Sequence, residues 1–120
     1  MTTPIILASG SEIRATLMRN AGVPFEVMVA RIDEEAIKSA LLAEAANPRD
    51  VADTLAELKA RKISARTPGA LVIGCDQVLE VGGALLSKPT NRTEALAQLK
   101  SLQGKTHRLL SAVVIYQNDE

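Results

Sequence analysis

Short apolar runs alternate with longer helix-forming stretches along this chain, and the alternation predicts an α/β domain. Strand-like runs lie at 4–8, 24–29, 70–75 and 105–116. A hairpin is expected at 78–87, because Gly82 and Gly83 stand between two apolar segments. Helix-forming stretches follow Ser11 and occupy 34–46, 47–66 and 91–104. The resulting order, β-α-β-α-α-β-β-β-α-β, is typical of a mixed sheet with flanking helices.

Capping residues mark where the helices begin. Asn47, with a proline behind it, restarts a helix, and Asn91 begins the last one. In the helix after Asn47, helical spacing places Val51, Leu55 and Leu58 on one face. In the helix after Asn91, we expect Leu96, Leu99 and Leu102 to point inward.

Two polar residues interrupt the most apolar strand. Ala70 to Cys75 is unbroken and reads as a buried strand, and Asp76 and Gln77 follow it. Ligand sites in α/β folds lie at the carboxyl ends of strands. Asp76 could therefore bind a divalent metal or act as a general base, or it could simply start a turn. Gln77 could read a base edge or face solvent.

The turn Ser9-Gly10-Ser11 follows a strand and opens a helix. Helix N-termini present unpaired N–H groups and the positive end of a dipole, which suit phosphate oxygens. Gly10 allows close approach, the two serines add hydroxyl donors, and Arg14 lies one helical turn further on. The alternative is that Ser11 only caps the helix and Arg14 is a solvated surface residue.

Other charged residues have both a chemical and a structural interpretation. Lys88, ahead of a proline at a strand end, suits a phosphate. Lys59 lies beside Arg61 and Lys62, where a solvated basic face is the simpler interpretation. The acidic cluster 33–35 precedes a helix, and the helix dipole alone could explain it.

Composition narrows the class of protein. Fourteen basic and fourteen acidic side chains cancel, which gives no electrostatic case for nucleic acid or an anionic membrane. Aromatic residues make up 2% of the chain, so no stacking platform for single strands is expected. Cys75 is the single cysteine, expected as a buried inert thiol, and His107 is expected to be structural. Without a signal peptide or spanning segment in view, we expect a cytoplasmic protein.

The order of these motifs resembles the Maf family from end to end. Members are nucleoside triphosphate pyrophosphatases, once described as septum-formation inhibitors. The resemblance implies a fold related to inosine triphosphate pyrophosphatase, with a cleft between two lobes. The matching blocks are Leu7 to Ser11 with Arg14, Asp33-Glu34, Leu58-Lys59-Ala60, Ile73 to Gln77, Lys88-Pro89, Glu94-Ala95 and Leu102 to His107.

The resemblance also implies roles for individual residues. The reaction would yield a nucleoside monophosphate and pyrophosphate, with a divalent cation, Mg²⁺ or Mn²⁺. Asp76 would be the metal-linked base that activates water, and Gln77 would contact the substrate. The phosphates would be held by Ser9, Ser11, Arg14, Lys59 and Lys88, and the metal by Glu34 and Asp76.

The resemblance extends to the substrate, with one departure. Gly74 to Gln77 reads Gly-x-Asp-Gln, which looks like the branch acting on 7-methyl-GTP, whereas the dTTP and UTP branch has Thr after the Asp. We expect 7-methyl-GTP; the alternatives are dTTP or UTP, or a non-catalytic nucleotide-binding regulator of cell division. Glu12 and Ile13 stand where many members have Pro and Arg, which weakens the positive field of the turn.

Family members are longer than this chain. We therefore expect residues 1–120 to form a single Maf-like domain that is truncated at its C-terminal end, with the second lobe incomplete. The resemblance also implies that the chain could form a homodimer.

Overall fold

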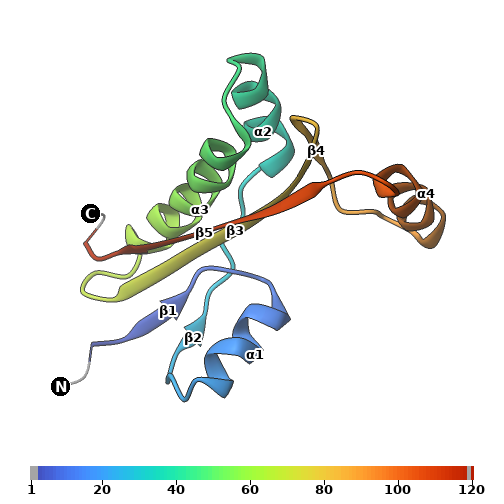
Figure 1. Cartoon of the computed structure of the whole chain (residues 1–120). Coiled ribbons are helices and arrows are strands. Elements are labelled where there is room, and N and C mark those ends of the chain that lie inside the picture. Colours follow the sequence, from blue (N-terminus) through green and yellow to red (C-terminus); the bar gives the residue numbers. More distant parts are fainter. Residues whose placement is uncertain (1–2, 119) are drawn as a thin grey trace.

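A mixed five-stranded sheet carries helices on both faces in the computed structural model, which describes residues 3–118 and 120 (Figure 1). This architecture confirms the predicted α/β class. The polar residues 117–120 predict a turn after the last strand, and Asp119 among them lies outside the described residues. The elements are β1 (Ile5–Leu7), α1 (Glu12–Asn20), β2 (Glu26–Val27), α2 (Glu34–Ala43), α3 (Pro48–Ser64), β3 (Leu71–Val81), β4 (Ala84–Leu86), α4 (Arg92–Leu102) and β5 (His107–Tyr116).

Strand β3 is the element around which the sheet is built. Its first three residues pair in parallel with β1, and its last three pair antiparallel with β4. Its other edge pairs antiparallel with β5, from Val72 opposite Tyr116 to Val81 opposite His107. The predicted break at Asp76 and Gln77 is wrong, since both lie inside β3. The pairing with β5 continues past both residues, and polar side chains do not end a strand that is paired in this way.

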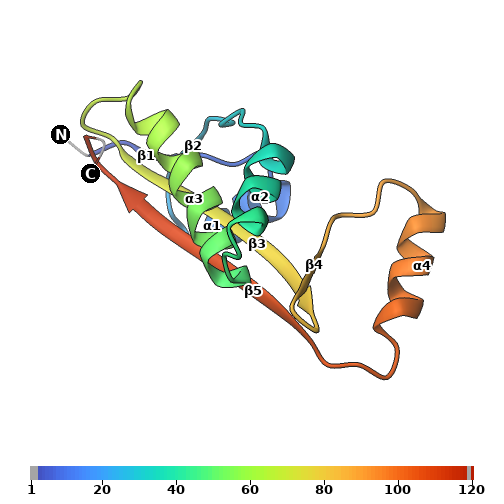
Figure 2. The same cartoon turned by 90° about the horizontal axis from the view of Figure 1, so that it is seen from above.

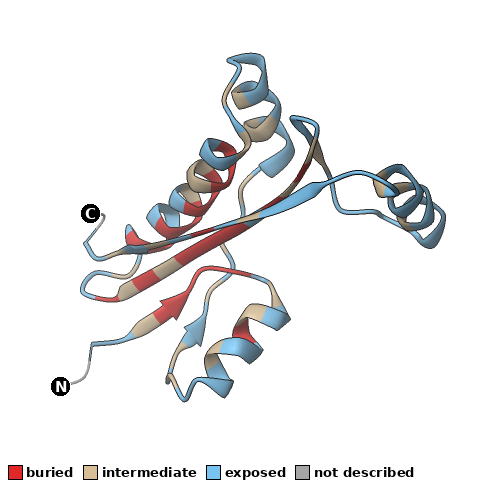
Figure 3. Ribbon diagram, viewed as in Figure 1, coloured by how far each residue is buried: buried red, intermediate tan, exposed pale blue. Residues whose placement is uncertain are grey.

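Helix α3 lies against one face of β3, and its beginning follows the prediction. The Asn47 side chain accepts a hydrogen bond from the Asp50 backbone N–H at 2.9 Å. Val51 and Leu55 are buried on the predicted face, and Leu58 is half-buried. Figure 3 shows the buried residues of α3 and β3 as two facing stripes. This contact forms the larger part of the core.

The two elements come closest at Gly74. A Cβ atom at this glycine would stand 2.3 Å from the carbonyl oxygen of Ala56 and 2.7 Å from the Cβ of Ala60. Both distances are too short for real atoms, so only glycine allows this approach. Three small residues thus set how near α3 lies to β3.

Helix α1 covers the opposite face of the sheet near β1. Leu7, Ala15 and Cys75 form its buried contact, with Phe25 packed against them. The larger apolar residues of the helix are not its buried ones: Ile13 is 75% exposed and Leu17 is 63% exposed. Both remain at the surface beside the turn that opens the helix.

Helix α4 stands apart from the other helices at one end of the molecule (Figure 2). Leu96 is 53% exposed and Leu99 is 65% exposed, so the prediction that they point inward is wrong. None of the described residues of this helix is buried. Gln98 ties the helix to the end of β4, because its Nε2 donates to the Ser87 carbonyl oxygen at 2.8 Å.

The remaining differences from prediction are small. Helix α2 ends at Ala43 rather than at residue 46, and the chain reverses at Ala45, whose φ is +60°. Strand β2 keeps two of the six residues expected at 24–29. In the part of the chain that is described, no helix combines the length and apolar character needed to cross a bilayer.

Replacing Gly74 with alanine should separate α3 from β3. The new methyl group meets backbone atoms that cannot rotate away, so we expect a loss at the upper end of the range of about 1–3 kcal/mol known for overpacked cores. Gly10→Ala is the matched control, because a Cβ there would meet only Val29 side-chain atoms at 3.7 Å. Urea unfolding of both variants tests this; equal midpoints would contradict the close contact.

Candidate functional site

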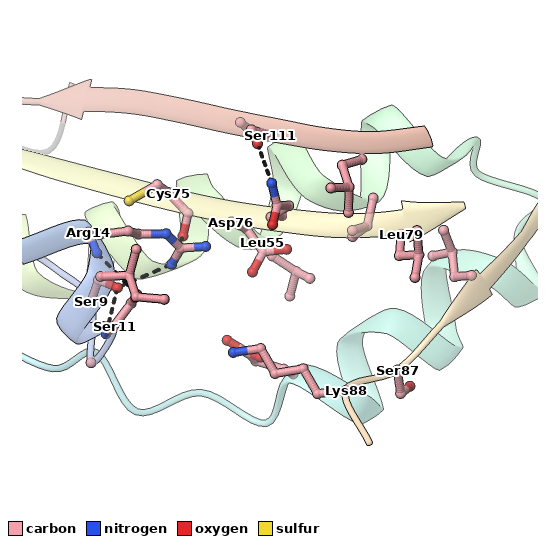
Figure 4. Close-up of a pocket in the computed structure, with 18 of the residues that line it drawn as sticks. Ser9, Ser11, Arg14, Leu55, Cys75, Asp76, Leu79, Ser87, Lys88 and Ser111 are labelled. Atoms are coloured by element: carbon pink, nitrogen blue, oxygen red, sulfur yellow. Dashed lines mark hydrogen bonds between the residues drawn. The ribbon is translucent and has the colours of Figure 1, made fainter. Parts of the chain in front are cut away.

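A cleft of about 980 Å³ opens along the edge of β3, between the ends of β1 and β4 (Figure 4). β1 pairs with β3 only as far as Ile73, and β4 begins pairing at Leu79, so the intervening stretch of β3 faces the cleft. The structure brings all the predicted site residues to its lining: Ser9, Ser11, Arg14, Glu34, Lys59, Asp76, Gln77 and Lys88.

The turn before α1 holds the side chain of Arg14 in place. The Ser9 hydroxyl oxygen accepts hydrogen bonds from the Ser11 backbone N–H at 3.1 Å and from Arg14 Nη1 at 3.2 Å. Arg14 Nη1 also lies 3.4 Å from the Cys75 carbonyl oxygen on β3. The Ser11 hydroxyl accepts from the Arg14 backbone N–H at 3.3 Å, which makes it the N-cap. Ser11 therefore caps the helix, and the Arg14 side chain turns toward β3 rather than into solvent.

Lys59 joins two carboxylates inside the cleft. Its Nζ lies 2.6 Å from Glu34 Oε1 and 3.0 Å from Asp76 Oδ1. Lys59 and Asp76 are each 8% exposed. The solvated basic face is thus the wrong interpretation for Lys59, whereas its neighbours Arg61 and Lys62 are exposed. A buried ammonium is tolerated here because it is paired with the buried carboxylate of Asp76 and the exposed carboxylate of Glu34.

The alternation of β3 sends its two polar residues to opposite faces. Asp76 faces α3, where Lys59 meets it, and Gln77 faces the other side. Gln77 Nε2 donates to the Ser111 hydroxyl on β5 at 2.9 Å (Figure 4). Lys88 follows the end of β4, and Figure 4 shows its side chain directed into the cleft.

Cys75 is buried as expected, next to the site. Burial raises the pKa of its thiol above the usual value, and the nearby positive charges of Arg14 and Lys59 oppose that rise in part. The thiol is therefore protonated at neutral pH and is a poor nucleophile. His107, also expected to be structural, lies exposed at the start of β5 and does not line the cleft.

The carboxylates fit a hard divalent cation. Glu34 and Asp76 contact the same ammonium group, so their oxygens lie close together, and carboxylate oxygens are the ligands that Mg²⁺ and Mn²⁺ prefer. Within residues 3–118 and 120, no three His, Cys, Asp or Glu side chains gather as a ligand group. Water and phosphate oxygens would therefore complete the coordination, as is usual for Mg²⁺.

Lys38 and Ser111 are among the polar residues of the lining that were missed from the sequence. Lys38 stands one helical turn after Glu34, and this spacing on a helix face could have revealed it. Its ammonium lies 3.6 Å from Glu35 Oε1. Ser111 is a lone hydroxyl within the apolar stretch of β5, which is a weaker signal.

Comparisons with known proteins agree on one family. The family model described as "Maf-like protein" matches residues 4–120. The chain is 62% identical over 120 residues to the nucleoside triphosphate pyrophosphatase of Ruegeria pomeroyi, covering 100% of this chain and 60% of that protein. It is 47% identical over 115 residues to the 7-methyl-GTP pyrophosphatase of Brucella abortus, covering 96% and 58%. The chain thus spans about 60% of the length of such relatives.

Replacing Lys59 with methionine should leave Asp76 buried without its ammonium partner. Breaking a buried ion pair in this way costs about 3–5 kcal/mol of unfolding free energy. Lys62→Met is the control on the same helix, where an exposed lysine donates to the Arg31 carbonyl oxygen and a loss of about 1 kcal/mol is expected.

A second substitution separates charge from packing. Adding Asp76→Asn to Lys59→Met removes the stranded carboxylate, so part of the lost stability should return in urea unfolding. If the double variant is less stable than Lys59→Met alone, the lysine contributes through packing rather than through charge.

Proposed function

Because this chain belongs to the Maf-like protein family, we propose that it acts as a nucleoside triphosphate pyrophosphatase, producing a nucleoside monophosphate and pyrophosphate. The names of its relatives support the proposal. The observation that carries it is the buried Lys59 between Glu34 and Asp76, in the same cleft as Arg14 and Lys88.

The phosphates are proposed to bind between Arg14 and Lys88. The N-terminus of α1 adds unpaired backbone N–H groups and the positive end of its dipole. Ser9 and the Cys75 carbonyl hold the guanidinium of Arg14 before any ligand arrives. Ser11 contributes by keeping the helix N-terminus formed, and its hydroxyl lies on the cleft. Donors already in position need no reorganisation as charge develops, which is how such sites lower a barrier.

Glu34 and Asp76 are proposed to hold Mg²⁺ or Mn²⁺. A bound divalent cation would polarise phosphoryl oxygens and neutralise part of the charge of the triphosphate. Lys59 keeps the two carboxylates together without a ligand, since its ammonium contacts both. The Lys59 ammonium also contacts Asp76, and we propose that it binds the phosphate oxygens when the substrate is present.

Asp76 is proposed to move the proton. Its Oδ1 is hydrogen-bonded to Lys59, which leaves Oδ2 to accept a proton from a water molecule. As that water forms its bond to phosphorus, the bond between the α and β phosphates breaks and pyrophosphate leaves with the electron pair. The burial of Asp76 keeps bulk water away from this carboxylate and strengthens its local electrostatic interactions.

We propose 7-methyl-GTP as the substrate and Gln77 as the residue that reads its base. Two features support this choice. Gln77 directly follows Asp76, the proposed general base. Relatives from two Brucella species, named 7-methyl-GTP pyrophosphatase, are 47% identical to this chain. More similar relatives, such as the protein of Ruegeria pomeroyi, carry the broader name nucleoside triphosphate pyrophosphatase.

Replacing Asp76 with asparagine tests the reaction. The amide keeps the shape but cannot take the proton, so pyrophosphate release should fall at least a hundredfold, within the range of about 10²–10⁴ for general bases. Release is measured with Mg²⁺ or Mn²⁺ on 7-methyl-GTP, GTP, dTTP and UTP. Asp50→Asn removes an exposed carboxylate and should change nothing. Nucleotide binding by the wild type without release would instead indicate a non-catalytic binding module.

A second copy of the chain is the protein partner that we propose, supported by the family resemblance alone. Sedimentation velocity of the purified chain should then give twice the 12.8 kDa mass of one copy. A single species at the mass of one copy would contradict the homodimer.

A further inference from the structure

We propose that Ser111 positions Gln77 as the base-reading group, so that the amide oxygen Oε1 of Gln77 is presented to the nucleobase. The inference rests on the proposed function and adds a residue to it. The two residues stand directly opposite each other in the pairing of β3 with β5. Their side chains are joined at 2.9 Å, from Gln77 Nε2 to Ser111 Oγ, and both line the cleft.

The surroundings of this pair suit a flat heterocycle. The neighbouring pair toward β4 on the same sheet face is Leu79 and Leu109, and both leucines line the cleft. Ile13 and Leu17 from α1 also line the cleft and are exposed. Small-molecule sites combine apolar walls with few polar groups that fix orientation. The amide of Gln77 is such a group within an apolar surface.

The hydrogen bond decides what the amide offers. A glutamine amide has two N–H donors and one oxygen acceptor. Donation to Ser111 uses one N–H and turns Nε2 toward β5, which leaves Oε1 to accept a hydrogen bond from a ligand. A base with a ring N–H donor, as in guanine and its 7-methyl derivative, matches this acceptor.

The hydrogen bond also removes freedom from an exposed side chain. Gln77 is exposed, and without Ser111 its amide could rotate and present either end to a base. Long polar side chains lose rotamer freedom when they bind, and a side chain that is already fixed loses less. Ser111 would thus act through Gln77 without touching the reacting atoms.

A double-mutant cycle tests this assignment with 7-methyl-GTP as the probe. Ser111→Ala should raise KM about two- to tenfold, the value of one hydrogen bond, while kcat stays nearly constant. In a Gln77→Ala background the same substitution should have no further effect. Ser111→Thr keeps the hydroxyl and should restore the wild-type KM. Ser39→Ala, an exposed serine outside the cleft, is the control.

Two results would overturn the inference: an unchanged KM in Ser111→Ala, or an equal rise in both backgrounds. If the wild type releases no pyrophosphate from any triphosphate, the proposed function fails by itself. The four proteins of the cycle, which are the wild type, Ser111→Ala, Gln77→Ala and the double variant, are then compared by calorimetry for binding of 7-methyl-GTP with a methylene bridge between its α and β phosphates. If the effects of Ser111→Ala and Gln77→Ala on that affinity are coupled, the role of Ser111 is supported. If the two effects are additive, or if Ser111→Ala has no effect, the role is rejected.

Discussion

The closeness of α3 to β3 at Gly74 is the constraint on which the rest of the structure depends. Because this position lacks a side chain, the backbone of the helix at Ala56 and Ala60 comes almost into contact with the strand. Residues beside this contact on both elements belong to the site. Lys59 precedes Ala60, and Asp76 lies on the same face of β3 as Gly74. A contact between apolar residues therefore sets the distance between two charged ones.

Local signals in the sequence predicted local structure well. Asn47 and Asn91 cap their helices because a capping side chain needs only the backbone three residues ahead of it. The break at Asp76 failed for the opposite reason. Whether a strand continues depends on its partner, and β5 lies more than thirty positions away along the chain. The inward direction of Leu96 and Leu99 failed likewise, since helical spacing shows that a face is apolar but not what covers it.

Single residues, taken one at a time, predicted only part of the site. Lys59 in isolation looked like part of a solvated face, and its burial follows from the approach of α3 at Gly74. The sequence allowed Arg14 to be a solvated surface residue, but its side chain contacts Ser9 and the Cys75 carbonyl oxygen of β3. Positions at strand ends and at a helix start indicated Asp76, Lys88 and Arg14 as candidates, and the resemblance to a family decided between the chemical and the structural interpretation of each. Neither the local pattern nor the resemblance indicated Ser111, because its proposed role depends on Gln77, which lies opposite it in another strand.

The uninterrupted course of β3 through Asp76 and Gln77 has an evolutionary consequence. One strand sends a carboxylate to one face and an amide to the other, so either side chain can change while the backbone and its neighbour stay as they are. Gain or loss of one residue within the strand is different, because it would exchange the two faces for every residue beyond it. Relatives with other substrate preferences should therefore differ from this chain by substitution at the position of Gln77, and should keep both Asp76 and the length of this strand.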